Sequence, residues 1–276
     1  MAEEMIKEGP ILYEKRGRTA IITMNRPEAM NAYGGGMDFE KVRDMAMADP
    51  EVWTVILTGA GEKAFCAGAD LKGADRDYRE TGKSFVVTRR DPLAVGRVGR
   101  PAGPGTLFPM NINKPVIAAI NGYCMGGGLE IALGCDIRIA SENAKFEASE
   151  IKRGLIPGIT PVLLPRVIPY SYAMEFMMTG RRIDAKEALH IGLVTKVVPL
   201  KELIPTCLAI CEESHQNAPL SVRALKTIAW NGLSLPVTES FAQAGTIFHW
   251  TIVPTEDAKE GTRAFVEKRK PVWKAR

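Results

Sequence analysis

A run of three glycines, Gly126–Gly128, stands two residues before a carboxylate, Glu130. It opens an apolar stretch that is predicted to be helical from about residue 127 to 134. Glycines here let the backbone approach a ligand and leave N–H groups free at a helix N-terminus. Aided by the helix dipole, such N–H groups can stabilise a developing negative charge. Taken alone, the triplet is better explained as a tight strand-to-helix turn. It matches neither Gly-x-Gly-x-x-Gly nor a P-loop with its lysine.

A second carboxylate, Glu150, lies in the segment Phe146–Ile151, shortly before a Gly154–Gly158 stretch. Its position alone does not assign it a role. Glu142 and Glu147 are close by in the sequence and have an equal claim to chemistry. Without further information, a charge facing solvent is the simpler interpretation of Glu150.

A second glycine-containing segment, Ala64–Lys72, changes this balance. Together with Asn121–Glu130 it resembles the two halves of the signature of the enoyl-CoA hydratase/isomerase (crotonase) family. In that family each half supplies one backbone N–H to an oxyanion hole for a thioester carbonyl. The resemblance implies Ala69 and Gly127 as the two donors here. It covers the chain from about Ile11 to the C-terminus and continues through Asn113–Ile120, Cys135–Ala140, Arg181–Ala185, Gly192–Val194 and Glu260–Arg269.

The resemblance also assigns catalytic roles, because Glu130 and Glu150 match the two glutamates of family hydratases. Adding water across an α,β double bond needs a base for the water and an acid for the α-carbon. Two glutamates in one pocket of low dielectric can supply both, since burial and mutual repulsion separate their pKa values. We expect Glu130 to orient and deprotonate water, and Glu150 to deliver the proton. The expected reaction is reversible hydration of a 2-enoyl-CoA to a 3-hydroxyacyl-CoA through a thioester enolate.

The resemblance further implies residues that bind the substrate and its coenzyme A. Phe265 and Lys268 match family positions that contact the nucleotide end, commonly from a neighbouring subunit. They are three apart and would share a helix face. A solvated helix end is an alternative for Lys268, as is a core position for Phe265. The expected substrate-binding set is completed by Ala67, Asp70, Leu71, Lys72 and Gly126, with Lys72 a second candidate for the phosphates.

Three segments depart from the common family pattern and leave the acyl group open. Ile159–Arg166 replaces a Gly-rich stretch that borders the acyl pocket, and Glu28 stands where many members carry Lys or another residue suited to coenzyme A. Residues 73–105 form a Gly- and Pro-rich, basic segment longer than in short-chain hydratases. Such a segment is either a functional lid or a solvated insert.

The elements that must position these residues are read from apolar patterns. Strands are expected at 11–13, 19–24, 53–58, 115–120 and 137–140, the first two as a hairpin. A helix is expected at 38–47, and further helices at 172–179, 185–191, 203–217, 221–231 and 239–251. The class is mixed α/β (α+β), and the resemblance implies a spiral of ββα units. We expect residues 1–200 to form this core and residues 201–276 a helical region that mediates trimerisation.

Composition bounds the remaining function classes. The chain has 276 residues with 46% hydrophobic and 25% charged residues, a net charge of +4 and five cysteines. Its mild basicity is far from a nucleic-acid-binding stripe, and its scattered Cys and His predict neither disulfides nor a metal site. The acidic N-terminus and the lack of long apolar runs predict no signal peptide or membrane span, hence a cytoplasmic protein.

We expect no cofactor, since coenzyme A enters as part of the substrate, and a homotrimer or dimer of trimers as the assembly. An isomerase or hydrolase that uses the same oxyanion hole is the first alternative. A non-catalytic, RNA-binding relative is a remoter one, disfavoured because basic and aromatic residues are not interleaved.

Overall fold

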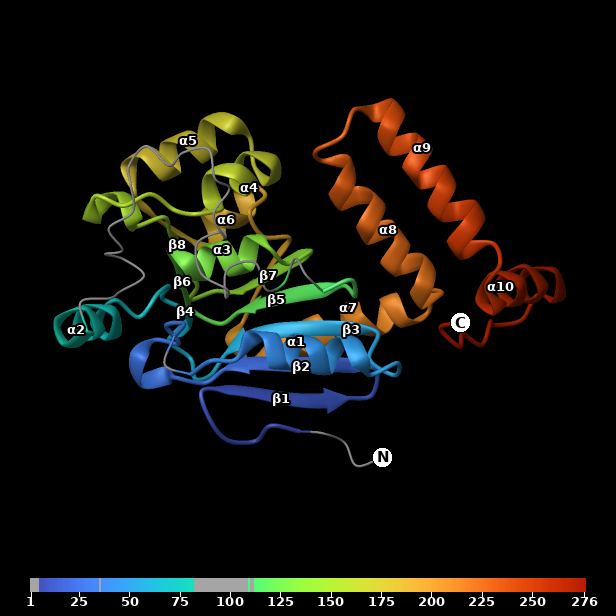
Figure 1. The fold of residues 1–276 in the computed structure, drawn as a ribbon, viewed down its shortest axis with the longest axis horizontal. Coiled ribbons are helices and arrows are strands. Elements are labelled where there is room, and N and C mark those ends of the chain that lie inside the picture. Colours follow the sequence, from blue (N-terminus) through green and yellow to red (C-terminus); the bar gives the residue numbers. More distant parts are fainter. Residues whose placement is uncertain (1–4, 35, 82–108, 110–111) are drawn as a thin grey trace.

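The largest element of the fold is a six-stranded sheet (Figure 1). The structure is a computed structural model that describes residues 5–34, 36–81, 109 and 112–276. β1 and β2 form the predicted antiparallel hairpin, and each later strand pairs in parallel with its neighbour. In sheet order the strands are β1 (Ile11–Arg16), β2 (Thr19–Met24), β3 (Thr54–Gly59), β5 (Val116–Ile120), β7 (Ile137–Ser141) and β10 (Lys196–Val198).

A second sheet of four short strands lies beside the first. β4, β6 and β8 pair in parallel, and β9 closes the sheet antiparallel to β8. The chain alternates between the sheets, so that β3 and β4 are followed by α2, and β5 and β6 by α3. This succession of ββα units confirms the predicted mixed α/β class. The bounds are β4 (Ala64–Cys66), β6 (Tyr123–Met125), β8 (Lys145–Glu147), β9 (Arg182–Asp184), α2 (Leu71–Thr81) and α3 (Gly127–Leu133).

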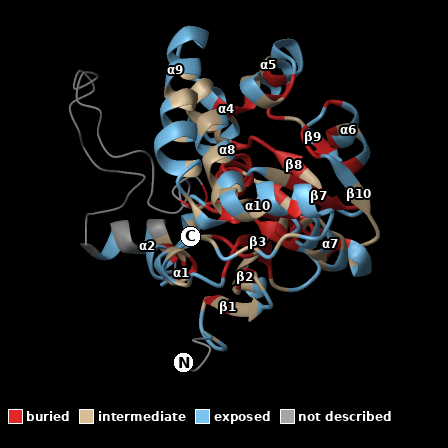
Figure 2. Ribbon diagram, turned by 90° about the vertical axis from the view of Figure 1, so that its right-hand side faces the viewer, coloured by how far each residue is buried: buried red, intermediate tan, exposed pale blue. Residues whose placement is uncertain are grey.

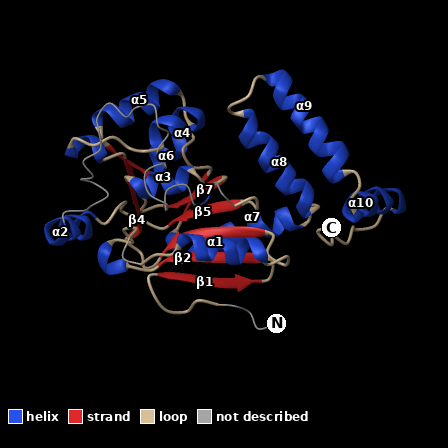
Figure 3. Ribbon diagram, in the orientation of Figure 1, coloured by secondary structure: helices blue, strands red, loops and turns tan. Residues whose placement is uncertain are grey.

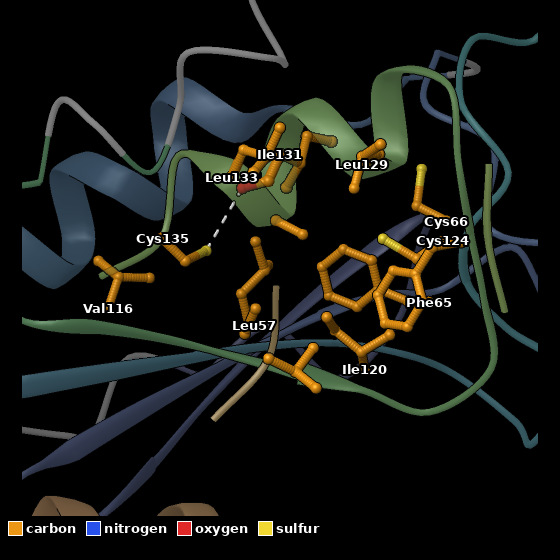
Figure 4. Close-up of a cluster of buried hydrophobic side chains, with 14 of the residues drawn as sticks. Leu57, Phe65, Cys66, Val116, Ile120, Cys124, Leu129, Ile131, Leu133 and Cys135 are labelled. Atoms are coloured by element: carbon orange, nitrogen blue, oxygen red, sulfur yellow. Dashed lines mark hydrogen bonds between the residues drawn. The ribbon is translucent and has the colours of Figure 1, made fainter. Parts of the chain in front are cut away.

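Both faces of the six-stranded sheet are buried, as expected for parallel strands (Figure 2). On one face Ile56 and Ile117 pack with Leu203 of α7 (Leu203–His215). On the other, Leu57 and Ile120 belong to a cluster that includes Leu129 of α3. Part of this cluster is drawn in Figure 4, where the Cys135 thiol lies 3.4 Å from the Ile131 carbonyl oxygen. All five cysteines are buried and free.

The C-terminal helices extend away from the sheets, and α10 lies at the opposite end of the molecule from α2 (Figures 1 and 3). Several of their large apolar side chains are exposed, including Phe241, Trp250 and Phe265. α7 itself packs on the six-stranded sheet, and the expected division at residue 200 stays a prediction. The remaining helices are α1 (Phe39–Ala48), α4 (Thr160–Val167), α5 (Tyr170–Thr179), α6 (Ala185–His190), α8 (Pro219–Gly232), α9 (Val237–Ile247), the π-helix η5 (Phe248–Ile252) and α10 (Glu256–Glu267); short 3-10 helices are η1 (Pro27–Ala29), η3 (Glu150–Arg153) and η4 (Leu200–Glu202).

The structure differs from the sequence prediction in a few elements. The first part of the 73–105 segment is helical, because α2 runs to Thr81; the rest of that segment lies outside the described residues. Lys268 is not within a helix turn. It is the residue that ends α10, with a left-handed φ of 53°, so it does not continue the helical face of Phe265. Within the described ranges, no helix is both long and apolar enough to cross a membrane.

Candidate active site

The glycine triplet forms the turn between β6 and α3, and each glycine is there for a structural reason. Gly126 has φ 54° and ψ −128°, a conformation that residues with a Cβ rarely adopt. A Cβ on Gly128 would lie 2.0 Å from the Cys66 carbonyl oxygen, so β4 touches the first turn of α3. A Cβ on Gly127 would lie 2.3 Å from Cε1 of Tyr33. The triplet therefore allows two other segments, at Cys66 and at Tyr33, to pack against one helix N-terminus.

The two halves of the signature meet at this helix end. Gly68 has φ 98°, and a Cβ placed on it would lie 3.2 Å from the Gly127 nitrogen. The backbone of Tyr33 pairs with the same segment: its N–H donates to the Gly68 oxygen at 2.8 Å, and its oxygen accepts from the Asp70 N–H at 3.0 Å. In such parallel pairing the intervening Ala69 N–H points away from Tyr33. Within the described part of the chain, neither the Ala69 nor the Gly127 N–H has a hydrogen-bond acceptor.

Glu130 is buried in the first turn of α3, with 3% of its surface exposed. Its Oε1 accepts hydrogen bonds from the N–H of Ile159 at 2.7 Å and of Thr160 at 3.5 Å. These N–H groups belong to the start of α4, where a carboxylate is favourable. Burial raises the pKa of Glu130, and the backbone donors at α4 only partly oppose that rise. The carboxyl group can therefore hold or release a proton closer to neutral pH than an exposed glutamate.

Glu150 opens η3 and faces the same helix end. Its Oε1 lies 3.1 Å from the position that a Cβ of Gly126 would occupy. Its Oε2 is buried and has no hydrogen-bond partner among the residues described. Burial raises the pKa of Glu150, and the nearby charge of Glu130 raises it further, against the pull of Arg153. A solvent-facing role is therefore excluded for Glu150, and the two glutamates interact electrostatically.

The neighbouring glutamates have different environments. Glu147 is tied at 2.9 Å to both Lys152 and Arg182. Burial alone would raise the pKa of Glu147, but these two hydrogen-bonded cations lower it overall. Glu142 is exposed. Of the three candidates left open by the sequence, Glu150 is the one that points to the α3 N-terminus.

Tyr33 also lies at this helix end, although no sequence motif singles it out. Tyr33 lies outside the strands and helices that the sequence predicts. It comes close to Gly127 only through tertiary packing. Burial raises its pKa, and the charges of Glu130 and Glu150 raise it further. The phenol thus stays protonated, and it lies close to both carboxylates.

The residues around Ala69 are held mainly by contacts within the fold. Asp70 accepts the Gly73 N–H at 2.9 Å at the start of α2 and pairs with Arg26 at 2.9 Å. The Gly73 N–H and the Arg26 side chain lower the pKa of Asp70. Leu71 is 38% exposed and Lys72 is exposed, so both can reach a ligand. The N–H of Ala67 donates to the Met30 oxygen at 3.0 Å.

Phe265 and Lys268 are not brought to the glutamates by their own chain, because α10 lies at one end of the molecule, separated from the central α3 (Figure 1). The side chain of Phe265 is 85% exposed, which excludes the core position considered for it. A hollow of about 630 Å³ lies between η5 and α10 and is lined by Phe248, Val253 and Val266 among others.

No group of three His, Cys, Asp or Glu residues in the described ranges could hold a metal ion.

The family model described as "Enoyl-CoA hydratase/isomerase" matches residues 14–91 and 107–276. (E)-benzylidenesuccinyl-CoA hydratase of Thauera aromatica is 40% identical over 96% of this chain and 99% of its own length. Carnitinyl-CoA dehydratase of Escherichia coli O157:H7 is 40% identical over 95% of this chain and 97% of its own.

Solved structures agree with these relatives. An enoyl-CoA hydratase from Mycobacterium marinum is 36% identical, with a TM-score of 0.84 over 98% of this chain and 100% of its own. Enoyl-CoA hydratase from Bacillus anthracis is 33% identical, with a TM-score of 0.83 over 97% of this chain and 100% of its own. The resemblance seen in the sequence is confirmed over nearly the whole length. The chain belongs to the enoyl-CoA hydratase/isomerase (crotonase) family.

Proposed function

We propose that this chain is a hydro-lyase that reversibly hydrates a 2-enoyl-CoA to a 3-hydroxyacyl-CoA. One observation carries the proposal: Glu130 and Glu150 face the α3 N-terminus beside the N–H groups of Ala69 and Gly127, which have no acceptor among the described residues. These N–H groups would receive the thioester oxygen as charge develops on it. The carboxyl groups would exchange protons with water and with the α-carbon.

In the proposed hydration, Glu130 acts on water and Glu150 on C2. Glu130, ionised, accepts a proton from water while the water oxygen bonds to C3 of the enoyl group. The electron pair of the C2–C3 double bond shifts toward the thioester, whose oxygen becomes an enolate held by Ala69 and Gly127. Glu150, protonated, then gives its proton to C2. A proton transfer from Glu130 back to Glu150 restores the starting state, and dehydration is the reverse sequence.

The raised pKa values of Glu130 and Glu150 support the proposed roles of these two groups as base and acid. Burial raises the pKa of both carboxyl groups, and the charge of Glu130 raises the pKa of Glu150 further, so Glu150 is the more natural carrier of the proton. Glu130 keeps Oε1 on the Ile159 N–H, which favours its ionised form. Oε2 of Glu150 has no hydrogen-bond donor within the described part of the chain, which favours the protonated form of Glu150. Neither step requires a metal or a further cofactor.

The acyl group is proposed to be a substituted one. The relatives with 40% identity are named for benzylidenesuccinyl-CoA and carnitinyl-CoA, whose acyl groups carry aromatic or charged substituents. The segment that departs from the common family pattern forms α4, whose N-terminus binds Glu130 and so borders the reacting atoms. A change of sequence there can alter the acyl pocket while the carboxylate stays in place.

We further propose that a neighbouring subunit completes the coenzyme A site in a homotrimer or a dimer of trimers. α10, which contains Phe265 and ends at Lys268, lies apart from α3 in Figure 1. The surrounding C-terminal helices expose Phe241, Trp250 and Val266, which are 80%, 81% and 74% exposed. Large apolar side chains exposed in this number are typical of an interaction surface. Analytical ultracentrifugation of the full chain tests the assembly directly.

The function is tested by following the conjugated enoyl-thioester absorbance with a panel of substrates. The panel should contain linear 2-enoyl-CoA esters of several lengths, an arylidene-succinyl-CoA and a trimethylammonium-bearing enoyl-CoA. Loss of absorbance without added cofactor supports a hydratase. Gain of absorbance from a 3-enoyl-CoA would indicate an isomerase instead, and release of free thiol a hydrolase. No reaction with any thioester would favour a non-catalytic, RNA-binding relative.

A further inference from the structure

The position of Tyr33 is set by backbone contacts on both sides. Its N–H and C=O bind Gly68 and Asp70, the residues that flank Ala69. Tyr33 is therefore attached to the same segment that presents the Ala69 N–H, and it cannot shift without moving that donor.

The side chain of Tyr33 reaches across to the other donor. Around a Cβ placed on Gly127, the nearest atoms are all from the Tyr33 ring, with Cε1 at 2.3 Å, the hydroxyl oxygen at 2.8 Å and Cζ at 2.9 Å. The phenol thus covers the α-carbon of Gly127 where any other residue would carry its side chain. One tyrosine therefore spans both halves of the oxyanion hole, through its backbone at Ala69 and through its ring at Gly127.

The hydroxyl group is available as a donor. Across the described ranges, the Tyr33 hydroxyl has no hydrogen-bond partner. Burial and the two carboxylates raise the pKa of Tyr33, so the group carries its proton at any working pH. A neutral phenol beside an oxyanion is a hydrogen-bond donor.

We infer that Tyr33 is a further catalytic residue, whose hydroxyl donates a third hydrogen bond to the thioester enolate oxygen beside the N–H groups of Ala69 and Gly127. The inference deepens the proposed function and rests on it in one respect, that a thioester oxygen binds at those two N–H groups. It does not depend on water being the reactant. Any reaction of this site that passes through an enolate would use the same donor.

The test uses acetoacetyl-CoA, a 3-ketoacyl thioester that ionises to an enolate with its own near-ultraviolet absorbance. Bound to the wild-type chain, it should show a raised enolate fraction. Tyr33→Phe keeps the ring and removes only the hydroxyl, so the bound enolate-to-keto ratio should fall about 10- to 10²-fold, the range for losing a hydrogen bond to a charged group. The hydration kcat should fall by a similar factor with KM changed by less than about threefold.

Tyr123→Phe is the matched control. Tyr123 is a partly buried tyrosine of β6 whose ring lies 5.3 Å from the Arg182 guanidinium. The Tyr123→Phe variant should leave the enolate ratio unchanged. Thermal melting of both variants shows whether the fold is intact.

An unchanged enolate ratio in Tyr33→Phe overturns the inference, as does a wild-type chain that binds acetoacetyl-CoA without raising its enolate fraction. A wild-type chain that raises the enolate fraction, but hydrates no enoyl-CoA, overturns the hydratase proposal alone. In that case the enolate ratio of Tyr33→Phe still decides the role of Tyr33.

Discussion

Oε1 of Glu130 accepts the N–H of Ile159 at 2.7 Å, which joins the first turn of α3 to the start of α4. The carboxyl group that is proposed to act on water therefore also accepts a hydrogen bond at the N-terminus of α4. Glu130→Gln keeps an amide oxygen that can accept this N–H, and should leave stability nearly unchanged. Glu130→Ala removes the acceptor at a helix N-terminus and should cost about 1–2 kcal/mol of unfolding free energy. Urea denaturation of both variants checks this, and equal stability of the two would contradict the helix-capping role.

The glycines at the start of α3 should respond differently to an added methyl group. In Gly128→Ala the Cβ meets the Cys66 carbonyl of β4, which cannot move aside, so we expect a loss of about 1–3 kcal/mol or more. In Gly127→Ala it meets the ring of Tyr33. Adding Tyr33→Ala should therefore restore part of the stability of Gly127→Ala and none of that of Gly128→Ala. Denaturation of the two double variants tests this; rescue of both, or of neither, would show that the packing is different.

His215 should make the fold sensitive to mild acid. It lies at the end of α7, with Nε2 2.9 Å from the Thr54 hydroxyl and Nδ1 3.5 Å from Glu212. Burial lowers the pKa of His215, Arg18 lowers it further, and Glu212 opposes both. The unfolded chain, with a histidine pKa of about 6.5, then binds more protons than the folded one. Stability from this group is present above that pH and is lost as the pH falls.

The measurement is urea denaturation at pH 7.5 and pH 5. His215→Gln should lose less stability between these two pH values than the wild type does. His249→Gln, at an exposed position, serves as the control and should follow the wild type. If all three chains lose the same amount, His215 is not the group responsible.

Lys268 should affect binding of the nucleotide end of coenzyme A rather than the chemistry. Lys268→Ala is expected to raise KM severalfold and leave kcat nearly unchanged, the pattern of lost uniform binding. The effect should shrink as salt rises, because exposed charges are screened. It should vanish with a truncated pantetheine thioester, which lacks the nucleotide phosphates. Lys270→Ala, also exposed at the same end of the chain, is the control. An equal loss with the truncated substrate would show that Lys268 has only a structural role.

Long, strongly patterned elements were predictable from the sequence. The apolar, β-branched runs at 54–59 and 116–120 became fully buried parallel strands, β3 and β5. β4, β6, β8 and β9 were missed, since three residues are too few to show a period and their pairing partners are distant in sequence. The helix expected at 221–231 begins earlier, because Pro219 stands in the first turn of α8, a position that proline favours.

The candidate site could be predicted only in part. The glycine conformation near residues 126–128 followed from local sequence, and the family resemblance singled out Glu130 and Glu150. The sequence could not separate Glu150 from Glu147, because the difference lies in the cations Lys152 and Arg182 that surround Glu147 in the fold. Tyr33 could not be predicted from the sequence either, because only tertiary packing places its ring against Gly127.

Glu150→Gln tests the central claim most directly. The change is isosteric, and the Oε2 that it replaces has no hydrogen-bond partner among the residues described, so melting should stay close to that of the wild type. Glu142→Gln, at an exposed position, is the matched control. With the best enoyl-CoA of the panel, the account predicts that Glu150→Gln lowers the hydration kcat by about 10²–10⁴, as for loss of a general acid, while Glu142→Gln has no effect. A folded Glu150→Gln variant that hydrates at the wild-type rate would contradict the assignment of the two glutamates.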